Sequence, residues 1–172
     1  KGRFNKKYSL EFLTKVLAEV LSIKAIYFIS SCYGKKVNHQ LQLMKPGEIC
    51  SLENVRFHIG EEKNDYNFSE SLAKNFDIYI NDAFSASHRK HASIVGITKY
   101  LPSLAGNNFI KEIESLNKLL YKPIKPATAI IGGSKVSTKL KLLNNFIEIF
   151  DTLIVGGAMA NTFLIAKGFN MG

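Results

Sequence analysis

The stretch ATAIIGGSKVSTKLKLLNNFIEIFDTLIVGGAMANT, residues 127–162, decides the fold of this chain. It predicts a strand over 127–131, a glycine turn, a helix over 137–150, a second strand over 151–157 and a helix over 158–167. The first helix has one apolar face, formed by Leu140, Leu143, Phe146, Ile147 and Phe150. Strands and helices that alternate through short connections are typical of parallel α/β units.

The turn GGSK after the first strand is a candidate anion site. Gly132 and Gly133 permit positive φ and let a ligand approach the backbone closely. The following helix would direct its free N–H groups and its positive dipole end at the turn. Lys135 and Lys139 are four residues apart, so both ammonium groups could reach one anion. The spacing is not that of a Walker loop, and a plain strand-to-helix turn with two surface lysines is the alternative.

A second glycine turn, VGGAMANT at 155–162, follows the next strand. It repeats the design of the first, with glycines at the carboxyl end of a strand that lead into a helix. Two such turns on neighbouring parallel strands would form one edge of a crevice. Open α/β sheets bind nucleotides at such an edge. The pair therefore favours a nucleotide site more than either turn does alone.

Upstream of these units, the pattern predicts a helix over 9–21, strands over 25–30, 47–55 and 77–82, a short helix opened by a capping box of Asn67 and Glu70, and a helix over 108–121. Two prolines in KPIKP then interrupt the chain. We expect an α/β fold of three-layer, parallel-sheet (Rossmann-like) units. They would form two incomplete domains, 1–107 and 123–172, joined by a helix over 108–122.

Two arginines stand at strand ends in the first predicted domain. Arg56 follows the strand that contains SLENV, and Arg89 lies in DAFSASHRKHAS, just past DIYIND. Arginine captures phosphate and carboxylate through paired hydrogen bonds, and ligands of α/β sheets bind at strand ends. A salt bridge to Glu53 or Asp82 is the structural alternative. His88 and His91 have no third ligand at a suitable spacing, so we predict no metal site.

The composition is that of an ordinary globular protein, with 172 residues, of which 46% are hydrophobic, and a net charge of +9. No stretch resembles a signal peptide or a membrane span, which predicts a soluble protein. Cys32 and Cys50 fit no disulfide or metal spacing, so we expect free thiols in a reducing compartment. The chain begins with Lys rather than Met and ends directly after a predicted helix, and we expect it to be a piece of a longer chain.

The basic charge leaves two classes of function open, an enzyme for anionic substrates and a module that binds nucleic acid. A nucleic-acid module would interleave basic and aromatic residues on one face. Here Phe146, Phe150 and Phe163 lie mostly on predicted core stripes instead. A truncated product without activity is a third hypothesis.

Four segments together resemble phosphoglycerate kinase in their order and spacing. They are SLENVRF, DIYINDAFSASHRKHASIVGITKYLPSLAG, PATAIIGGSKVSTKLKLLNN and DTLIVGGAMANTFLIAKG. The resemblance implies a glycolytic kinase that moves a phosphoryl group between ATP and 3-phosphoglycerate, or between 1,3-bisphosphoglycerate and ADP in reverse. It also implies a cytoplasmic monomer, Mg²⁺ carried by the nucleotide, and no nucleic-acid or membrane partner.

The resemblance carries over to individual residues. Arg56 and Arg89 resemble the arginines that hold the phosphoglycerate, and Lys135 resembles the lysine that stabilises the phosphoryl group in transfer. The residues that resemble nucleotide contacts are Lys139, Gly133, Ser134 and Gly157. The first predicted domain would hold phosphoglycerate, the second the nucleotide, and the helix between them would act as the hinge.

The chain also departs from the pattern of that family. Ala158 and Ser85 stand where glycine is usual, and Ser51 stands where leucine is usual. The family's early substrate-binding loop and its later ribose-binding segment have no counterpart in these residues. The resemblance therefore implies that these 172 residues alone do not catalyse the reaction.

Overall fold

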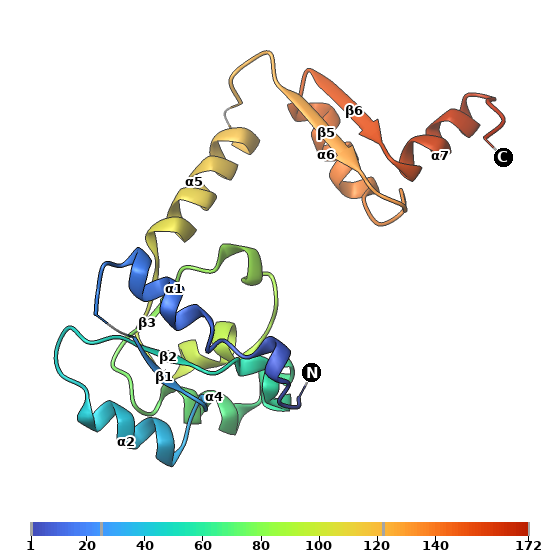
Figure 1. Ribbon diagram of the computed structural model, residues 1–172. Helices are drawn as coiled ribbons and strands as arrows, with labels where there is room; N and C mark the ends of the chain where they lie inside the picture. The colour runs from blue at the N-terminus through green and yellow to red at the C-terminus, as the bar shows by residue number, and fades with distance from the viewer. Residues whose placement is uncertain (1, 25, 122, 172) are drawn as a thin grey trace. The chain divides into compact units, whose positions relative to one another are not determined.

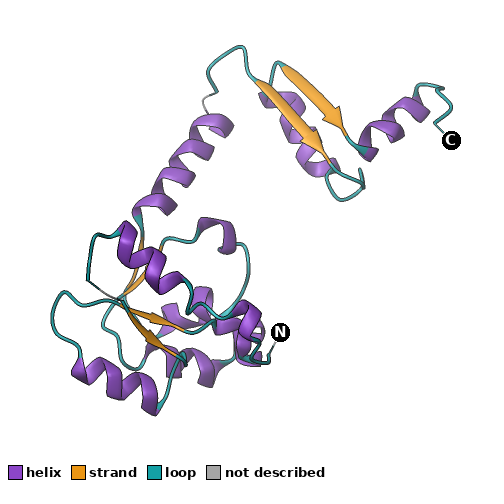
Figure 2. Cartoon of the chain, in the orientation of Figure 1, coloured by secondary structure: helices purple, strands orange, loops and turns teal. Residues whose placement is uncertain are grey.

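A computed structural model describes residues 2–24, 26–121 and 123–171. The chain divides into two compact units, Lys1–Ile110 (unit 1) and Lys111–Gly172 (unit 2). Figures 1 and 2 show the helices and strands of each unit.

Unit 1 begins with η1 (Lys6–Tyr8), α1 (Leu13–Val20), β1 (Tyr27–Ile29), α2 (Lys35–Leu43), β2 (Cys50–Leu52) and η2 (Val55–Phe57). It continues with α3 (Ile59–Lys63), α4 (Tyr66–Ala73), β3 (Tyr79–Asn81), η3 (Phe84–Ala86), the π-helical turn η4 (Ala92–Gly96), η5 (Ile97–Lys99) and β4 (Ser103–Ala105). The helix α5 (Asn107–Tyr121) starts in unit 1. Unit 2 adds β5 (Thr128–Gly132), α6 (Leu140–Ile149), β6 (Thr152–Gly156) and α7 (Ala158–Ala166).

The described strands pair as three two-stranded parallel sheets, β1–β2, β3–β4 and β5–β6. In unit 1 Tyr27 lies opposite Cys50, and Tyr79 lies opposite Ser103. In unit 2 Gly132 lies opposite Gly156, so the two glycine turns leave neighbouring strands at the same level. This arrangement confirms the predicted α/β class, although the sheets are small.

Most predicted elements form, but several boundaries differ. The other strands are shorter than their patterns, whereas β5 keeps the predicted length and is shifted by one residue. Residue 25 of the predicted strand 25–30 and residue 122 of the predicted helix 108–122 lie outside the described residues. The strand β4 was not predicted, because three residues are too few to show a period of two.

The predicted capping box on α4 is wrong. The side chain of Asp65 caps this helix by accepting a 2.8 Å hydrogen bond from the Phe68 N–H. Asn67 lies inside the helix, whose first residue is Tyr66. Asp is as good a cap as Asn, and its carboxylate also suits the positive end of the helix dipole.

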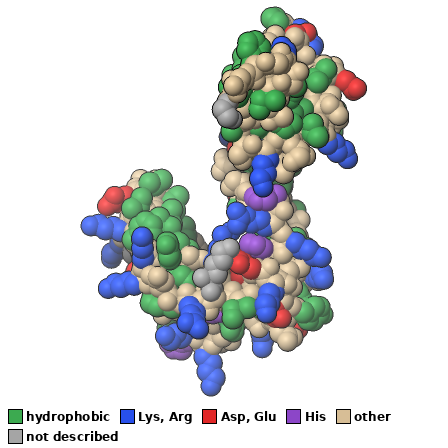
Figure 3. All heavy atoms as spheres, turned by 90° about the vertical axis from the view of Figure 1, so that its right-hand side faces the viewer, with side chains coloured by type: hydrophobic (Ala, Val, Ile, Leu, Met, Phe, Trp, Pro, Cys, Tyr) green, Lys and Arg blue, Asp and Glu red, His purple; other side chains and the backbone are tan. Residues whose placement is uncertain are grey.

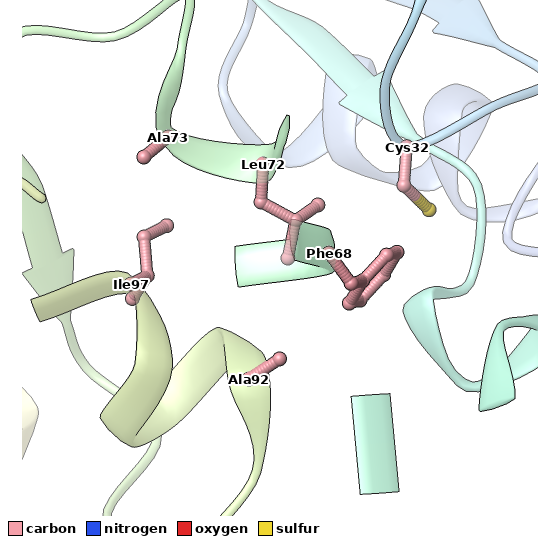
Figure 4. Packing of buried hydrophobic residues seen from close by; sticks show 6 residues of the cluster. All are labelled: Cys32, Phe68, Leu72, Ala73, Ala92 and Ile97. Carbon is pink, nitrogen blue, oxygen red and sulfur yellow. The ribbon is translucent and has the colours of Figure 1, made fainter. Parts of the chain in front are cut away.

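The core of unit 1 gathers side chains from three separate segments (Figure 4). Phe68 and Leu72 of α4 lie between Cys32, which follows β1, and the π-helical turn with its neighbour η5. Figure 4 labels the six buried residues of this cluster, Cys32, Phe68, Leu72, Ala73, Ala92 and Ile97. Val55, next to Arg56 in the segment after β2, also packs against this cluster, so the segments after β2 and β3 that carry the two arginines both contact it.

Unit 2 has a smaller core, formed by Ile131, Leu143 and Met159. Each comes from a different element, β5, α6 and α7, so this cluster holds the two glycine turns against the start of α7. Among the described helices of both units, none is long and apolar enough to cross a membrane.

Candidate functional site

The two glycine turns of unit 2 touch each other. The N–H of Met159 donates a 2.9 Å hydrogen bond to the carbonyl oxygen of Gly133, and so joins the second turn to the first. Both Gly133 and Gly157 have positive φ, at 155° and 65°. A Cβ on Gly157 would lie 3.2 Å from Gly133 O and 3.3 Å from Gly133 N. Only glycine permits this conformation and this close approach together.

The side chain of Lys139 folds back over the first turn. Its Nζ lies 2.5 Å from the position that a Cβ on Gly133 would occupy, and Met159 Sδ lies 3.3 Å from the same position. The lysine is half-buried. The ammonium group, the Gly133 backbone and the start of α7 therefore meet at one place.

The helix after the first turn begins later than predicted. Instead of starting at 137, α6 starts at Leu140, and Lys139 is the residue that precedes it. Residues 136–139 form a turn in which the Thr138 hydroxyl donates to Lys135 O at 3.0 Å and Lys139 N–H donates to Val136 O at 2.8 Å. Such local hydrogen bonds compete with helix formation, and Val136 also packs against the core of unit 2.

This later start changes the relation between the two lysines. Lys135 and Lys139 are not one helical turn apart on α6, as the spacing predicted, but lie at either end of the 136–138 turn. Lys135 and Ser134 are both exposed, whereas Lys139 is partly covered by the turn. The ammonium group of Lys135 is thus exposed at the surface, whereas that of Lys139 lies against the glycine turn.

In unit 1, Arg56 lies in the short helix η2, which directly follows β2 and the residue pair Glu53–Asn54. The Asn54 side chain caps η2 by accepting a 3.0 Å hydrogen bond from the Arg56 N–H. Its Nδ2 donates to Tyr8 O at 3.0 Å, which attaches the N-terminal segment to the same turn. The backbone at Arg56 is therefore fixed on both sides.

Glu53 is buried, and its carboxylate gathers three donors. The Ser9 hydroxyl (2.7 Å), the Leu10 N–H (3.0 Å) and the Asn54 N–H (2.7 Å) all donate to it. Burial alone would raise the pKa of Glu53, but the three hydrogen bonds together lower it below its usual value. The sequence reasoning considered Glu53 only as an ion-pair partner of arginine and missed this anchoring role.

Arg89 occupies an exposed turn between η3 and η4. Its N–H donates to Ala86 O at 3.1 Å, and its Nε lies 3.3 Å from Nε2 of His88. Among the described residues, neither Arg56 nor Arg89 forms an ion pair with a carboxylate. Asp82, the suggested partner, caps α5 by accepting from the Phe109 N–H at 2.9 Å and from Asn108 Nδ2 at 2.8 Å.

A second buried carboxylate, Glu61, lies beneath the segment that follows Arg89. It accepts hydrogen bonds from the N–H and the hydroxyl of Ser93, and it lies 3.5 Å from Nδ1 of His91. His91 is therefore held close to a buried carboxylate. Within the described residues, no three His, Cys, Asp or Glu side chains are grouped closely enough to hold a metal ion. Ser93 lies 32 residues from Glu61 in the sequence, and no local pattern indicated this contact.

The remaining basic residues do not form one patch on the face that Figure 3 shows. Lys and Arg side chains lie scattered there among hydrophobic and polar ones.

Both cysteines are free, as predicted.

The three departures from the family pattern fit without strain. Ser85, in η3, is exposed and is not among the described residues with positive φ, so its Cβ costs nothing there. Ser51 lies at the centre of β2 opposite Phe28. Ala158 begins α7 with an exposed side chain.

Parallel α/β units with glycine turns at the carboxyl ends of their strands are an arrangement that many phosphate-binding proteins share. The family model of phosphoglycerate kinase matches residues 1–172. The chain is 49% identical to a phosphoglycerate kinase of Brucella suis over all 172 residues, which cover 43% of that protein. It is 48% identical to that of Rhizobium meliloti over 164 residues, which cover 95% of this chain and 41% of the relative.

Solved structures agree with the sequence comparison. The phosphoglycerate kinase of Coxiella burnetii superposes with a TM-score of 0.81 at 38% identity, and covers 100% of this chain and 42% of its own. That of Pyrococcus horikoshii gives a TM-score of 0.82 at 33% identity, with 95% and 42% covered. The chain belongs to the phosphoglycerate kinase family. It spans about two fifths of the length of these relatives.

Proposed function

We propose that this chain contributes to phosphoryl transfer between ATP and 3-phosphoglycerate. The observation that carries the proposal is the joined pair of glycine turns in unit 2. There the Met159 N–H binds Gly133 O, and the Lys139 ammonium group lies over Gly133. Backbone that a ligand can approach, a helix start and a lysine are the groups that bind nucleotide phosphates.

The roles of the residues divide between the two units. Gly133, Ser134, Gly157 and Lys139 would contact the nucleotide, which brings Mg²⁺ with it as part of the substrate. Arg56 and Arg89 would hold the phosphoglycerate, and the helix α5 would serve as the hinge between residues 1–107 and 123–172. The enzyme would act as a monomer in the cytoplasm.

The chemistry needs no covalent help from the protein. A carboxylate oxygen of 3-phosphoglycerate attacks the γ-phosphorus of ATP, and an acyl phosphate bond forms. The bond from the γ-phosphorus to the β–γ bridging oxygen breaks, and ADP leaves with that electron pair. The protein must hold both substrates in line and offset the charge on the transferring group. The exposed ammonium of Lys135 would provide that charge.

The test compares three variants of the protein as its source cells make it. Lys139→Met should weaken ATP binding roughly 10- to 100-fold, because a charged hydrogen-bond donor is lost. Arg56→Ala should raise the KM for 3-phosphoglycerate by a similar factor and leave the KM for ATP unchanged. Lys135→Met should lower kcat by about 100-fold or more with smaller effects on both KM values.

The control is Lys141→Met, which removes an exposed lysine of α6 outside the turn and should change none of these constants. Salt-sensitive binding to any polynucleotide, with ATP binding unaffected by Lys139→Met, would support the nucleic-acid alternative instead.

A further inference from the structure

We propose that Glu61 is a positioning residue for Arg89: its buried carboxylate fixes the segment that holds this arginine toward 3-phosphoglycerate. The inference rests on the proposed function, since it assigns Arg89 to the substrate. Glu61 itself is only 2% exposed, so it acts through the residues around it rather than on a ligand.

The carboxylate of Glu61 contacts three groups within one short segment. Oε2 accepts from the Ser93 N–H at 3.0 Å, and Oε1 accepts from the Ser93 hydroxyl at 2.7 Å. Oε1 also lies 3.5 Å from Nδ1 of His91, which is itself mostly buried. A buried carboxylate is costly unless donors surround it, and these three contacts are what compensate for its burial.

The segment that Glu61 binds is directly connected to Arg89. The His91 N–H donates to Arg89 O at 3.0 Å, and the Arg89 N–H donates to Ala86 O at 3.1 Å. On its other side, His91 O accepts from the N–H groups of Ile94 and Val95 at the start of η4, at 3.1 and 2.8 Å. The turn that carries Arg89 is thus closed by its own backbone, and Glu61 anchors its end to the rest of unit 1.

The anchor point is closely packed, with two glycines against α4. A Cβ on Gly60, next to Glu61 in α3, would lie 2.8 Å from Phe68 Cβ of α4. A Cβ on Gly96, the last residue of η4, would overlap the Ser69 hydroxyl of the same helix. Both α3 and η4 therefore sit directly on α4, and Glu61 bridges them across this support.

A simple role in folding would also place a satisfied carboxylate here, so the test must separate the two roles. If Glu61 acts through Arg89, Glu61→Gln should raise the KM for 3-phosphoglycerate about tenfold, because small misplacements of a binding group are costly. The KM for ATP should not change. The amide keeps the volume but has only one accepting oxygen, so it cannot accept from the Ser93 N–H and from the Ser93 hydroxyl at the same time.

A double-mutant cycle in the protein as its source cells make it tests the route of the effect. Glu61→Gln should leave the KM for 3-phosphoglycerate unchanged in an Arg89→Ala background and should raise it about tenfold in an Arg56→Ala background. The matched control is Glu70→Gln, which alters an exposed glutamate of α4 and should change neither KM. Ser93→Ala should act in the same direction as Glu61→Gln, more weakly, and provides the cycle if Glu61→Gln does not fold.

An equal rise in the Arg89→Ala and Arg56→Ala backgrounds would overturn the inference. So would a loss of melting temperature with no change in the KM for 3-phosphoglycerate. If the unmodified protein does not bind 3-phosphoglycerate at all, the proposed function fails together with this inference. If the unmodified protein binds it but Glu61→Gln has no effect on its KM, only the positioning role of Glu61 fails.

Discussion

Met159 and Gly133 are joined by a single backbone hydrogen bond of 2.9 Å that connects the two glycine turns of unit 2. Met159 is also fully buried in the core of that unit, with Ile131 and Leu143 as neighbours. The same residue therefore attaches the candidate nucleotide turn to the core through its side chain and to the other turn through its N–H. Changes at the turns should be felt both in stability and in nucleotide binding.

The variant Gly157→Ala should lower both the stability of unit 2 and its affinity for nucleotide. The alanine would have to adopt a φ of 65°, and its Cβ would lie 3.2 Å from Gly133 O. With its ψ of −162°, this backbone lies in a region that is essentially restricted to glycine, and a non-glycine residue there costs about 1–3 kcal/mol. The melting temperature of unit 2 and the affinity for ATP should therefore both fall. Calorimetry and nucleotide titration measure the two effects.

Gly156→Ala is the matched control, because it is the adjacent glycine and a Cβ there meets nothing within 4 Å. Equal effects of the two substitutions would contradict the assignment of the strain to Gly157.

Stability should fall in acid because of Glu53. Its three hydrogen bonds hold its pKa below the usual value of 4.5, so the folded protein binds the proton less readily than the unfolded chain. The stabilisation is fully present above that pH and is lost as the pH falls through the lower pKa of the folded state. Urea unfolding at a series of pH values should show this loss, and Glu53→Gln should flatten the curve below pH 4.5.

As the pH falls, His58 should cause a loss of stability that begins at a higher pH than the loss caused by Glu53. Its ring packs against both Tyr33 and Phe68, with centroid distances of 5.1 and 5.2 Å, and burial lowers its pKa below 6.5. The unfolded chain then binds a proton that the folded chain resists, so stability declines as the pH falls below about 6.5. His58→Phe keeps an aromatic ring there and should remove this part of the pH dependence. A decline of the same size in His58→Phe would exclude His58 as its source.

The two free thiols should differ in reactivity. Burial, with help from the nearby Glu53 and Glu61 carboxylates, raises the pKa of Cys32 to about 12, and its Sγ lies 2.8 Å from Glu53 O. Cys50 is half-buried, and burial raises its pKa as well. Because the thiolate is the reactive form, iodoacetamide at pH 8 should label Cys50 slowly and Cys32 only after unfolding. Mass spectrometry of the labelled peptides measures the order, and faster labelling of Cys32 would contradict it.

The parts of the fold that depend on local patterns could be predicted from the sequence. The alternation of strand and helix patterns over residues 127–162 predicted the parallel unit of β5, α6 and β6, and the glycines in this stretch indicated both turns. Arg56 and Arg89 were proposed as site residues because they follow predicted strand ends, and they do lie in the segments after β2 and β3. Each of these inferences needs only a few consecutive residues.

Contacts between distant residues could not be predicted in this way. Glu53 binds Ser9, 44 residues away, and Glu61 binds Ser93, 32 residues away, with no periodicity to indicate either pair. The start of α6 was predicted too early, because local hydrogen bonds compete with the helix propensity of these residues. Hydrogen bonds within the 136–139 turn and the packing of Val136 outweighed the helical pattern.

The position of Lys139 has an electrostatic consequence for unit 2. The lysine is the residue immediately before α6, so its positive charge belongs to the end of the helix where the dipole is also positive. Like charges in such proximity repel each other, and an anion that binds between them relieves the repulsion. We therefore expect an anion that binds there to stabilise the fold of unit 2, and inorganic phosphate should shift the unfolding equilibrium toward the native state, by more the more tightly it binds.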